Sequence, residues 1–306
     1  MTAKIFIDGE HGTTGLQIRE RLEARDDLVL LSLAHEDRRD AGKREQLLKD
    51  ADIAILCLPD DAAREAVALA ADSGTRFIDA STAHRTHPDW VYGFAEAELG
   101  QAQRIAKAQF VSNPGCYSTG AIAILRPLVL AGLLPTDYPV TINAVSGYTG
   151  GGKQMIAQME NTDAPDAIHA PYFAYALTLA HKHVPEIISR SGLTRRPIFT
   201  PNVSRFPQGM LVNIPLHLDL LAGEPSYAHV HHALADHYVD QTIVEVVASD
   251  GLPSRLDPTE LANTDRLRIY LTHNTGAGHI NIIASLDNLG KGASGAAVQN
   301  LDLMLS

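Results

Sequence analysis

The sequence predicts an α/β protein with two domains, a Rossmann-type domain on a parallel sheet and an α+β domain on a mixed or antiparallel sheet. The first part of the chain alternates short apolar strands with helices, which is typical of a doubly wound parallel sheet. Later segments alternate apolar and polar residues, as half-exposed antiparallel strands do. A chain of 306 residues is also long enough for two domains.

The composition excludes several classes of protein. Charged residues make up 20% of the chain and hydrophobic residues 45%, which is ordinary for a soluble globular protein. The net charge of −11 argues against nucleic-acid binding, although a local group of arginines can still bind an anionic small substrate. Two cysteines, Cys57 and Cys116, are too few for a disulfide framework and indicate a reducing compartment.

The N-terminus lacks the pattern of a signal peptide, because only three apolar residues separate Lys4 from Asp8. No apolar run approaches the roughly 20 residues that a membrane span needs. We therefore expect a cytoplasmic protein without membrane partners.

A short strand over residues 4–7 opens the predicted Rossmann domain and runs into a glycine-rich turn. The turn has the spacing Gly-x-x-Gly-x-x-Gly and precedes a helix with Leu16, Ile18 and Leu22 on roughly one side. Glycines let the backbone approach a pyrophosphate, and the N-terminus of the helix binds it. The predicted dinucleotide-binding residues are Gly9, Gly12, Thr13, Thr14 and Gly15.

The segment after the second predicted strand, residues 28–33, bears on the choice of cofactor. NAD-specific proteins normally place an acidic residue here to hold the ribose hydroxyls. Glu36 and Asp37 keep NAD possible, but Arg38 and Arg39 suit the 2′-phosphate of NADP. We favour NADP; the alternative is a solvated charged loop.

Three more strands complete the predicted parallel sheet, over residues 52–59, 76–79 and 110–111. Asp60 or Asp61 is expected to cap the helix that follows the third strand. The polar residues 79–87 follow the end of the fourth strand, where open α/β sheets place their ligands. Arg85 in this segment is a candidate to clamp a phosphate or a carboxylate, and the alternative is a surface arginine.

The chain is organised around Cys116. A strand breaks at Asn113-Pro114-Gly115, a strong turn signal, and an apolar helix follows. Cys116 should therefore lie at the N-terminus of this helix, where unpaired N–H groups and the helix dipole favour a thiolate. The same N–H groups could stabilise an oxyanion when the thiolate attacks a carbonyl. The alternative is a buried cysteine that packs as a small hydrophobic residue.

The second predicted domain begins at Cys116. Its strands are expected over residues 140–145, 211–218, 244–247, 267–271 and 279–283. We assign residues 1–115 to the Rossmann domain and 116–289 to the catalytic domain. The C-terminal helix, about residues 290–306, is predicted to return to the first domain and complete it. Small residues from Gly292 onwards indicate close packing on another backbone or on a cofactor.

Residues 146–153 form a loop rich in backbone N–H groups, and Ser146 and Gly147 are its first residues. The loop resembles an anion cradle and opens a probable helix. It lacks the full phosphate-loop pattern, so we predict a substrate loop and not an ATP site.

Two histidines and a glutamate, His181, His183 and Glu186, lie in one short segment. A zinc site would need further ligands and a helical His-Glu-x-x-His motif or a relative of it, so we predict no metal. A general acid for Cys116 is favoured, because acyl transfer needs a proton for a developing oxyanion. The two imidazoles share one face if the segment is extended but lie roughly 200° apart if it is helical. Which histidine acts stays open.

These motifs together resemble those of the N-acetyl-gamma-glutamyl-phosphate reductase family, in its compact subgroup. Residues 112–120 resemble the family's active-site signature, residues 181–187 its His-x-His-x-Pro-Glu-Ile segment, and residues 287–295 its loop on the cofactor side. The nucleotide turn is also similar, so the resemblance covers essentially the whole chain. One difference is the pair Glu10 and His11, which stands where relatives often carry small residues.

The resemblance implies NADPH-dependent reduction of N-acetyl-glutamyl 5-phosphate to the semialdehyde, with release of phosphate, in arginine biosynthesis. It implies a thioester on Cys116, a proton from a histidine with help from Glu186, and a cofactor contact at Asn288. The acyl phosphate is expected near Arg85, Asn113, Ser146 and Gly147. We also expect a homo-oligomer, either a dimer or a tetramer.

Two alternatives stay open. One is another acyl-phosphate reductase of similar build, acting on an aspartyl or an aminoadipyl substrate. The other is a nucleotide-sensing regulator without catalysis. Cys116 in its turn and the histidine pair argue against the regulator, because a sensor needs neither.

Overall fold

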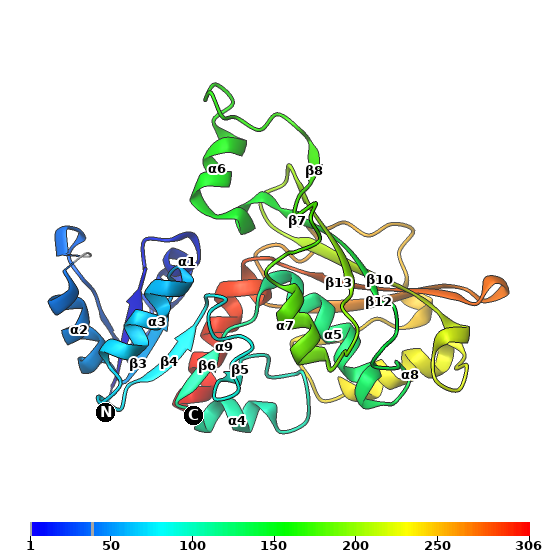
Figure 1. The fold of residues 1–306 in the computed structure, drawn as a ribbon, viewed down its shortest axis with the longest axis horizontal. Helices are drawn as coiled ribbons and strands as arrows, with labels where there is room; N and C mark the ends of the chain where they lie inside the picture. The colour runs from blue at the N-terminus through cyan, green and yellow to red at the C-terminus, as the bar shows by residue number, and fades with distance from the viewer. Residues whose placement is uncertain (1, 38–39) are drawn as a thin grey trace. The chain divides into compact units, whose positions relative to one another are not determined.

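The computed structural model describes residues 2–37 and 40–306, which form two compact units. The first unit consists of the described residues up to Ala95, Gly100–Pro114 and Ala293–Ser306. The second unit consists of Glu96–Leu99 and Gly115–Gly292. Figure 1 shows the helices and strands of both units, coloured along the chain.

The first unit is built on a six-stranded sheet in the order β2-β1-β3-β4-β6-β5, and all neighbouring strands are parallel. Its strands are β1 Ala3–Asp8, β2 Leu28–Leu31, β3 Ile53–Leu56, β4 Arg76–Asp79, β5 Val91–Tyr92 and β6 Phe110–Ser112. The predicted parallel sheet is confirmed. The additional strand β5 is too short to be recognised from an apolar pattern.

Helices cover both faces of this sheet. They are α1 Thr13–Leu22, α2 Ala41–Asp50, α3 Asp60–Leu69, α4 Gln101–Lys107 and α9 Gly295–Leu305. Ile5 and Ile7 of β1 pack in one buried cluster with α1 and α9, whereas Phe6 packs in another with α2 and α3. Since successive side chains of a strand point to opposite faces, the sheet has a core on each side. The C-terminal helix α9 belongs to this unit, as predicted.

Two local predictions in this unit are wrong. Leu16 is 44% exposed and does not join the buried side of α1, which Ile18 does. The N-cap of α3 is Pro59, where the sequence predicts an aspartate. The carboxylate of Asp60 instead accepts hydrogen bonds from the N–H and the hydroxyl of Thr82, because it lies within reach of the segment after β4.

The second unit is built on a seven-stranded sheet in the order β11-β12-β13-β10-β7-β9-β8. Its strands are β7 Thr141–Gly147, β8 Tyr172–Ala174, β9 Ile198–Ser204, β10 Met210–His217, β11 Val244–Val246, β12 Leu267–Asn274 and β13 His279–Leu286. The pairs β7–β9 and β11–β12 are parallel and the other pairs antiparallel, so the mixed sheet is confirmed. The sequence patterns do not predict β8 and β9.

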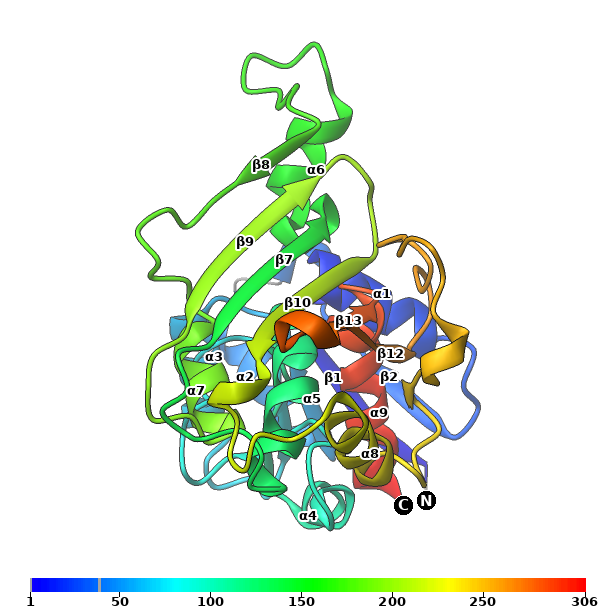
Figure 2. The ribbon, with the colours of Figure 1, turned by 90° about the vertical axis from the view of Figure 1, so that its right-hand side faces the viewer.

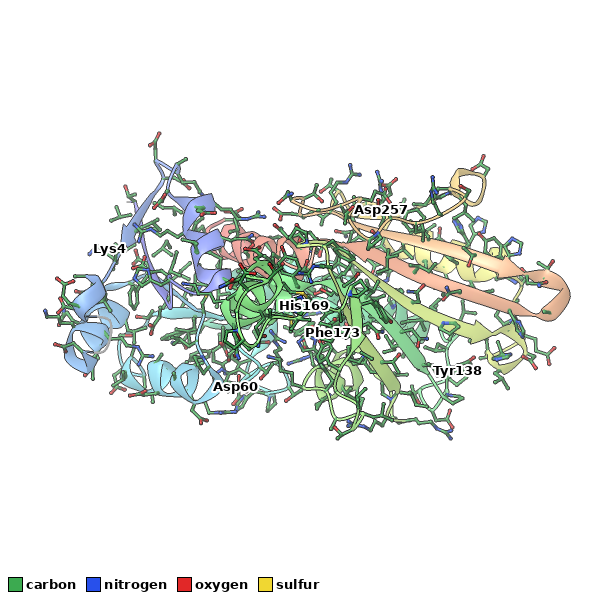
Figure 3. The ribbon with its side chains drawn as sticks, turned by 90° about the horizontal axis from the view of Figure 1, so that it is seen from above. Lys4, Asp60, Tyr138, His169, Phe173 and Asp257 are labelled. Carbon is green, nitrogen blue, oxygen red and sulfur yellow. The ribbon has the colours of Figure 1, made fainter. Side chains whose placement is uncertain are left out.

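The helices of the second unit are α5 Cys116–Leu130, α6 Gly152–Glu160, α7 Val184–Ser191 and α8 Tyr227–His237. The helix α5 packs against β10, β13, α7 and α8 (Figure 2). Gly120 allows the close approach, because a Cβ atom there would lie 2.8 Å from a methyl group of Val212. The segment with α6 and β8 has its own apolar cluster, which includes Met159 and Phe173. Phe173 is labelled in Figure 3. In the described part of the chain, no helix is long and apolar enough to span a bilayer.

Candidate active site

Cys116 is the first residue of α5, where the sequence predicts it. The N-cap is Gly115, an extended residue with no side chain to cap the helix. The thiol is partly exposed. The start of a helix carries unpaired N–H groups and the positive end of the dipole, and both favour a thiolate. The position can therefore activate a nucleophile.

The carboxylate of Glu186 binds the start of α5. Its Oε1 accepts a hydrogen bond from the N–H of Gly115 at 2.9 Å, and its Oε2 accepts one from the hydroxyl of Ser118 at 2.8 Å. Glu186 lies in the first turn of α7 and is 1% exposed. These contacts fix the turn that presents Cys116.

The two histidines lie side by side in a tight turn, which is neither the extended nor the helical arrangement that the sequence suggests. His183 is the N-cap of α7, and its N–H donates to Nδ1 of His181 at 3.1 Å. The ring centroids lie 4.7 Å apart, and they are 5.8 and 5.9 Å from the ring of Tyr117. Since Nδ1 of His181 accepts a hydrogen bond, the neutral ring carries its proton on Nε2.

Two tyrosines that sequence reasoning misses complete this cluster. The Tyr175 hydroxyl lies 3.2 Å from Nε2 of His181, within hydrogen-bond distance. Burial raises the pKa of Tyr175 to about 12, and the charge of Cys116 adds to this effect. Burial, followed by the charges of Tyr175 and Cys116, also raises the pKa of Tyr117. Both hydroxyls therefore stay protonated at neutral pH, and that of Tyr117 donates to the carbonyl of Asn202 at 3.0 Å.

Ser146 and Gly147 lie at the end of β7, where the predicted substrate loop begins. Ser146 is buried, its hydroxyl donates to the carbonyl of Gly147 at 3.0 Å, and it also interacts with the Tyr117 hydroxyl. A Cβ atom on Gly147 would lie 2.3 Å from the carbonyl oxygen of Pro207. Ser146 thus reaches the cluster around Cys116, while Gly147 is needed for close backbone packing.

Asn288 and Gly292 hold the segment after β13 in place. Oδ1 of Asn288 accepts from the N–H of Gly209 at 2.8 Å, and its Nδ2 donates to the hydroxyl of Thr149 at 3.0 Å. A Cβ atom on Gly292 would lie 2.8 Å from Cβ of Cys116. The predicted close packing at Gly292 is therefore on the backbone of the cysteine. The cofactor contact of Asn288 stays a prediction, and both polar atoms of its amide already bind the protein.

The glycine turn of the first unit has the geometry of an anion cradle. Gly9 has a φ of +91°, and a Cβ atom there would lie 2.4 Å from the carbonyl oxygen of Cys57. A Cβ atom on Gly15 would lie 2.3 Å from the carbonyl oxygen of Gly9. Both positions require glycine. The N-cap of α1 is Gly12, which has no capping side chain. Within residues 2–37 and 40–306, the Thr13 hydroxyl is buried and has no hydrogen-bond partner.

A cavity of about 310 Å³ lies over this turn, at the carboxyl ends of β1 and β3. It is lined by Phe6, Ile7, Asp8, Gly9, Glu10, His11, Gly12, Leu33, Cys57 and Leu58. Parallel sheets bind nucleotides at this edge. The glycine cradle, the orphaned hydroxyl and the cavity fit a nicotinamide dinucleotide. Arg38 and Arg39, on which the choice of NADP depends, lie outside the described residues.

Glu10 stands in the glycine turn where a small residue is usual, and the structure shows why it is tolerated. Glu10 as a whole is 6% exposed, and its carboxylate pairs with the guanidinium of Arg19. The hydroxyl of Ser32, just after β2, donates to the same carboxylate at 3.3 Å. The charge is thus compensated inside the unit.

Arg85 and Asn113, two predicted substrate residues, contact each other in the first unit. Nε of Arg85 donates to the carbonyl of Asn113 at 3.0 Å, and its Nη2 donates to the carbonyl of Ala80 at 3.0 Å. The amide of Asn113 donates to the carbonyl of Ala293 at 2.9 Å and accepts from Asn300 at 3.0 Å. These contacts fix the segment that leads to Cys116, and substrate binding by either residue stays a prediction.

Among the described residues, no group of three or more His, Cys, Asp or Glu side chains is arranged to hold a metal ion. Cys57 has a different environment from Cys116. Burial raises the pKa of the Cys57 thiol to about 12, and the nearby Asp79 and Asp8 contribute. Cys57 is therefore an unreactive thiol at neutral pH.

The fold is similar to solved structures of known enzymes. The crystal structure of aspartate semialdehyde dehydrogenase II from Vibrio cholerae matches with a TM-score of 0.77 and 17% identity, covering 100% of this chain and 99% of that one. Aspartate semialdehyde dehydrogenase from Francisella tularensis matches with a TM-score of 0.76 and 12% identity, covering 99% and 100%. At these identities the similarity establishes the fold.

Sequence comparison defines the class of protein. The family model "Semialdehyde dehydrogenase, NAD binding domain" matches residues 34–107, and "Semialdehyde dehydrogenase, dimerisation domain" matches residues 116–288. Fold and site together are thus those of the semialdehyde dehydrogenase class. The N-acetyl-gamma-glutamyl-phosphate reductases of Rhizobium meliloti (strain 1021) and Brucella ovis are each 60% identical to this chain over 309 residues. Both alignments cover 100% of this chain, and they cover 100% of the Rhizobium protein and 99% of the Brucella protein. The chain belongs to the N-acetyl-gamma-glutamyl-phosphate reductase family.

Proposed function

We propose that this protein reduces N-acetyl-gamma-glutamyl phosphate to the corresponding semialdehyde with NADPH, through a thioester on Cys116. The observation that carries the proposal is the position of Cys116 at the start of α5, next to Tyr117, whose ring lies 5.8 Å from that of His181. The chain is also 60% identical over its full length to reductases of this name. The first unit would bind the cofactor and the second would carry the chemistry.

The first chemical step belongs to Cys116. Its thiolate attacks the acyl carbon, a C–S bond forms, and the bond to the phosphate oxygen breaks, so that phosphate leaves with the electron pair. Backbone N–H groups at the start of α5 stabilise the oxyanion of the tetrahedral intermediate. Glu186 keeps these groups in place through Gly115 and Ser118.

When bound, the nicotinamide cofactor supplies the hydride that reduces the thioester. We propose His181 as the proton donor to the resulting oxygen, because its ring proton lies on Nε2 next to Tyr175. His183 would orient His181 through the hydrogen bond to Nδ1. The ring of His181 then takes this proton back as the C–S bond breaks, so that the aldehyde leaves and Cys116 returns to the thiolate.

For the cofactor, we propose that Gly9, Gly12 and Gly15 receive the pyrophosphate and that the Thr13 hydroxyl donates a hydrogen bond to it. Arg38 and Arg39 would bind the 2′-phosphate. Replacing both arginines with alanine should weaken NADPH binding and affect NADH binding much less, as measured by nicotinamide fluorescence. Equal loss for both cofactors, or no loss, would place the specificity elsewhere.

The substrate is tested in the reverse direction. Purified protein is supplied with NADP⁺, phosphate and one of three semialdehydes: N-acetyl-glutamate semialdehyde, aspartate semialdehyde or aminoadipate semialdehyde. Phosphate-dependent NADPH formation should be fastest with the first. Preference for another would reassign the substrate, and inactivity with all three at intact cofactor binding would favour the nucleotide-sensing alternative.

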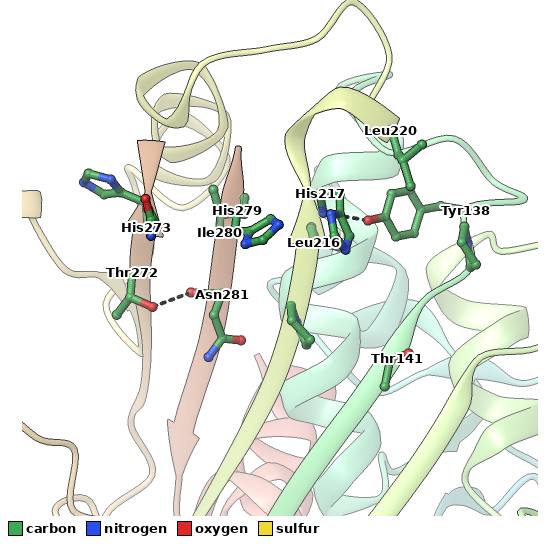
Figure 4. Close-up of a pocket in the computed structure, with 13 residues that line it drawn as sticks. Tyr138, Thr141, Leu216, His217, Leu220, Thr272, His273, His279, Ile280 and Asn281 are labelled. Atoms are coloured by element: carbon green, nitrogen blue, oxygen red, sulfur yellow. Dashed lines mark hydrogen bonds between the residues drawn. The ribbon is translucent and has the colours of Figure 1, made fainter. Parts of the chain in front are cut away.

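We propose further that the protein is a cytoplasmic homo-oligomer, assembled through the sheet face opposite α5. On this face a row of polar residues crosses five strands, and each side chain hydrogen-bonds to a side chain or a backbone carbonyl of the next strand. The row consists of Thr200, Asn143, Asn213, Asn281 and Thr272. A cavity of about 670 Å³, lined by His217, His279 and other residues, continues it (Figure 4).

The assembly is tested by light scattering on two variants. Asn213→Arg places a charge in the row and should lower the mass in solution. Val239→Arg changes a residue that is 74% exposed outside this face and serves as the control. An unchanged mass for Asn213→Arg would place the interface elsewhere.

A further inference from the structure

A lysine and a glutamate form an ion pair inside the second unit. Nζ of Lys291 lies 2.7 Å from Oε2 of Glu96, and both side chains are 2% exposed. Removing two charges from water is costly, and apolar residues of similar volume often serve stability as well or better. Moving either group away would leave a charge buried alone, so the ion pair holds the ammonium group of Lys291 beside Glu96.

Lys291 lies in a turn that is held at its other end by Asp287. The carboxylate of Asp287 accepts hydrogen bonds from the N–H of Leu289 at 2.8 Å and from the amide of Gln208 at 2.9 Å. Its carbonyl accepts from the N–H of Gly292 at 2.9 Å. The turn from Asp287 to Gly292 is therefore fixed at its start by one carboxylate and near its end by the ion pair.

The turn packs against Cys116. A Cβ atom on Gly292 would lie 2.8 Å from Cβ and 3.2 Å from Cα of Cys116, so the two backbones are in contact. Lys291 immediately precedes Gly292. A shift of the lysine would therefore move the surface against which Cys116 rests.

We propose that the Lys291–Glu96 ion pair is a positioning device for the thiol of Cys116, acting through Gly292. The pair holds Gly292 against the cysteine, and this contact keeps the thiol over the N–H groups at the start of α5. Lys291 and Glu96 are positioning residues and take no part in the chemistry. The proposal rests on the proposed role of Cys116 as the nucleophile.

The test replaces the pair with apolar residues. In Lys291→Met/Glu96→Leu the charges disappear together, so neither is left buried alone and the protein is expected to fold. The control is Arg126→Gln/Glu98→Gln, which removes an ion pair between α5 and the same short segment that carries Glu96. The readouts are the thermal midpoint, kcat and KM, and the pH dependence of alkylation of Cys116 by iodoacetamide, located by peptide mass spectrometry.

The apolar pair should lower kcat by about tenfold or more with KM nearly unchanged, because a displacement of about 1 Å can cost up to 100-fold. The midpoint of the alkylation profile should rise by about one pH unit as the thiol leaves the helix N-terminus. The control variant should keep the wild-type profile. A folded apolar pair with wild-type kcat and alkylation midpoint would overturn the proposal.

A second variant keeps the test decisive if the apolar pair does not fold. Gly292→Ala displaces Cys116 directly and should raise the alkylation midpoint, whereas Gly276→Ala, where a Cβ atom has an ordinary contact at 3.6 Å, should not. Alkylation needs no substrate, so this measurement distinguishes a failure of the positioning proposal from a failure of the proposal that Cys116 is the nucleophile. A wild-type midpoint near the ordinary thiol value of about 8.5 would count against Cys116 as nucleophile. A low wild-type midpoint that Gly292→Ala leaves unchanged would count against positioning alone.

Discussion

The helices α1 and α5 lie in different units, follow a strand in each case, and have the same kind of N-cap. Gly12 caps α1 with φ −73° and ψ 169°, and Gly115 caps α5 with φ −80° and ψ 148°. At α5 the protein supplies partners: Glu186 binds Gly115, and the Thr119 hydroxyl donates to the Gly115 carbonyl at 3.0 Å. At α1, by contrast, the described residues leave the buried Thr13 hydroxyl unsatisfied.

The difference indicates what each helix start is for. The start of α5 is rigidified by protein groups, which suits the presentation of a nucleophile that must not move. The start of α1 keeps an unsatisfied donor and a glycine cradle, which suits an anion that comes and goes. Substitutions at the start of α5 should therefore lower the stability of the protein, whereas substitutions at the start of α1 should weaken cofactor binding and leave stability nearly unchanged.

The largest effect is expected at the histidines beside α5. His181→Asn should lower kcat by about 10²- to 10⁴-fold, the usual contribution of a general acid, with cofactor binding retained. His183→Asn should cost less, because its N–H to His181 comes from the backbone and survives the substitution. Steady-state kinetics on both variants checks this. A greater loss for His183→Asn would reverse the assignment, and full activity of both would make the segment scaffold.

The next largest effect is expected for substitutions of Glu186, which binds the start of α5. The start of α1 has no such carboxylate partner among the described residues. Glu186→Ala leaves the N–H of Gly115 buried without its acceptor and should destabilise the protein by about 1–3 kcal/mol. Glu186→Gln keeps an acceptor of the same shape and should recover most of the stability while kcat stays about tenfold low. Chemical denaturation measures the contribution of Glu186 to stability, and steady-state kinetics measures its contribution to kcat. Wild-type values for Glu186→Ala would refute the role of this contact.

A matched pair of threonines tests the comparison directly. Thr119→Val removes a satisfied hydroxyl at α5 and should destabilise the protein by about 1 kcal/mol. Thr13→Val removes an unsatisfied hydroxyl at α1, so it should leave stability unchanged or slightly higher and weaken NADPH binding by about tenfold or less. Thermal unfolding measures the change in stability, and cofactor titration measures the change in NADPH affinity. The same signature in both variants would mean that the two helix starts do not differ as described.

The smallest effect concerns pH and the two cysteines. Burial raises the pKa of Cys57 from 9.0 to about 12, so the folded protein holds this proton more tightly than the unfolded chain. The corresponding stability is present below about pH 9 and is lost as the pH rises through about 12. Cys57→Ala should therefore flatten the alkaline fall of the thermal midpoint. At pH 7, iodoacetamide should label Cys116 and leave Cys57 unmodified; labelling of Cys57 would contradict its raised pKa.

The sequence predicts the fold well because both sheets leave strong periodic signals. The buried strand Ile53–Leu56 is continuously apolar, and β10 alternates as a half-exposed strand should. The local motif around Cys116 is also predictable, because Pro114 and Gly115 end a strand just before an apolar helix. These features depend on neighbours in the sequence.

The contacts that complete the site depend on residues far apart in the sequence. Tyr175 carries no motif, and its hydroxyl matters because the chain folds it onto His181. The partners Glu96 and Lys291 are 195 positions apart, so no spacing rule connects them. The cap of α3 was mispredicted for a similar reason, since Asp60 is recruited by Thr82 from beyond the next strand.

The most direct test of covalent catalysis is to trap the intermediate. The protein is mixed with N-acetyl-gamma-glutamyl phosphate in the absence of reduced cofactor, quenched in acid and digested. The peptide that contains Cys116 should carry the mass of the acyl group, hydroxylamine should remove it, and Cys116→Ala should lack both the adduct and more than about a hundredth of the activity. Turnover without an adduct on Cys116, or an active Cys116→Ala, would contradict a mechanism that runs through this thiol.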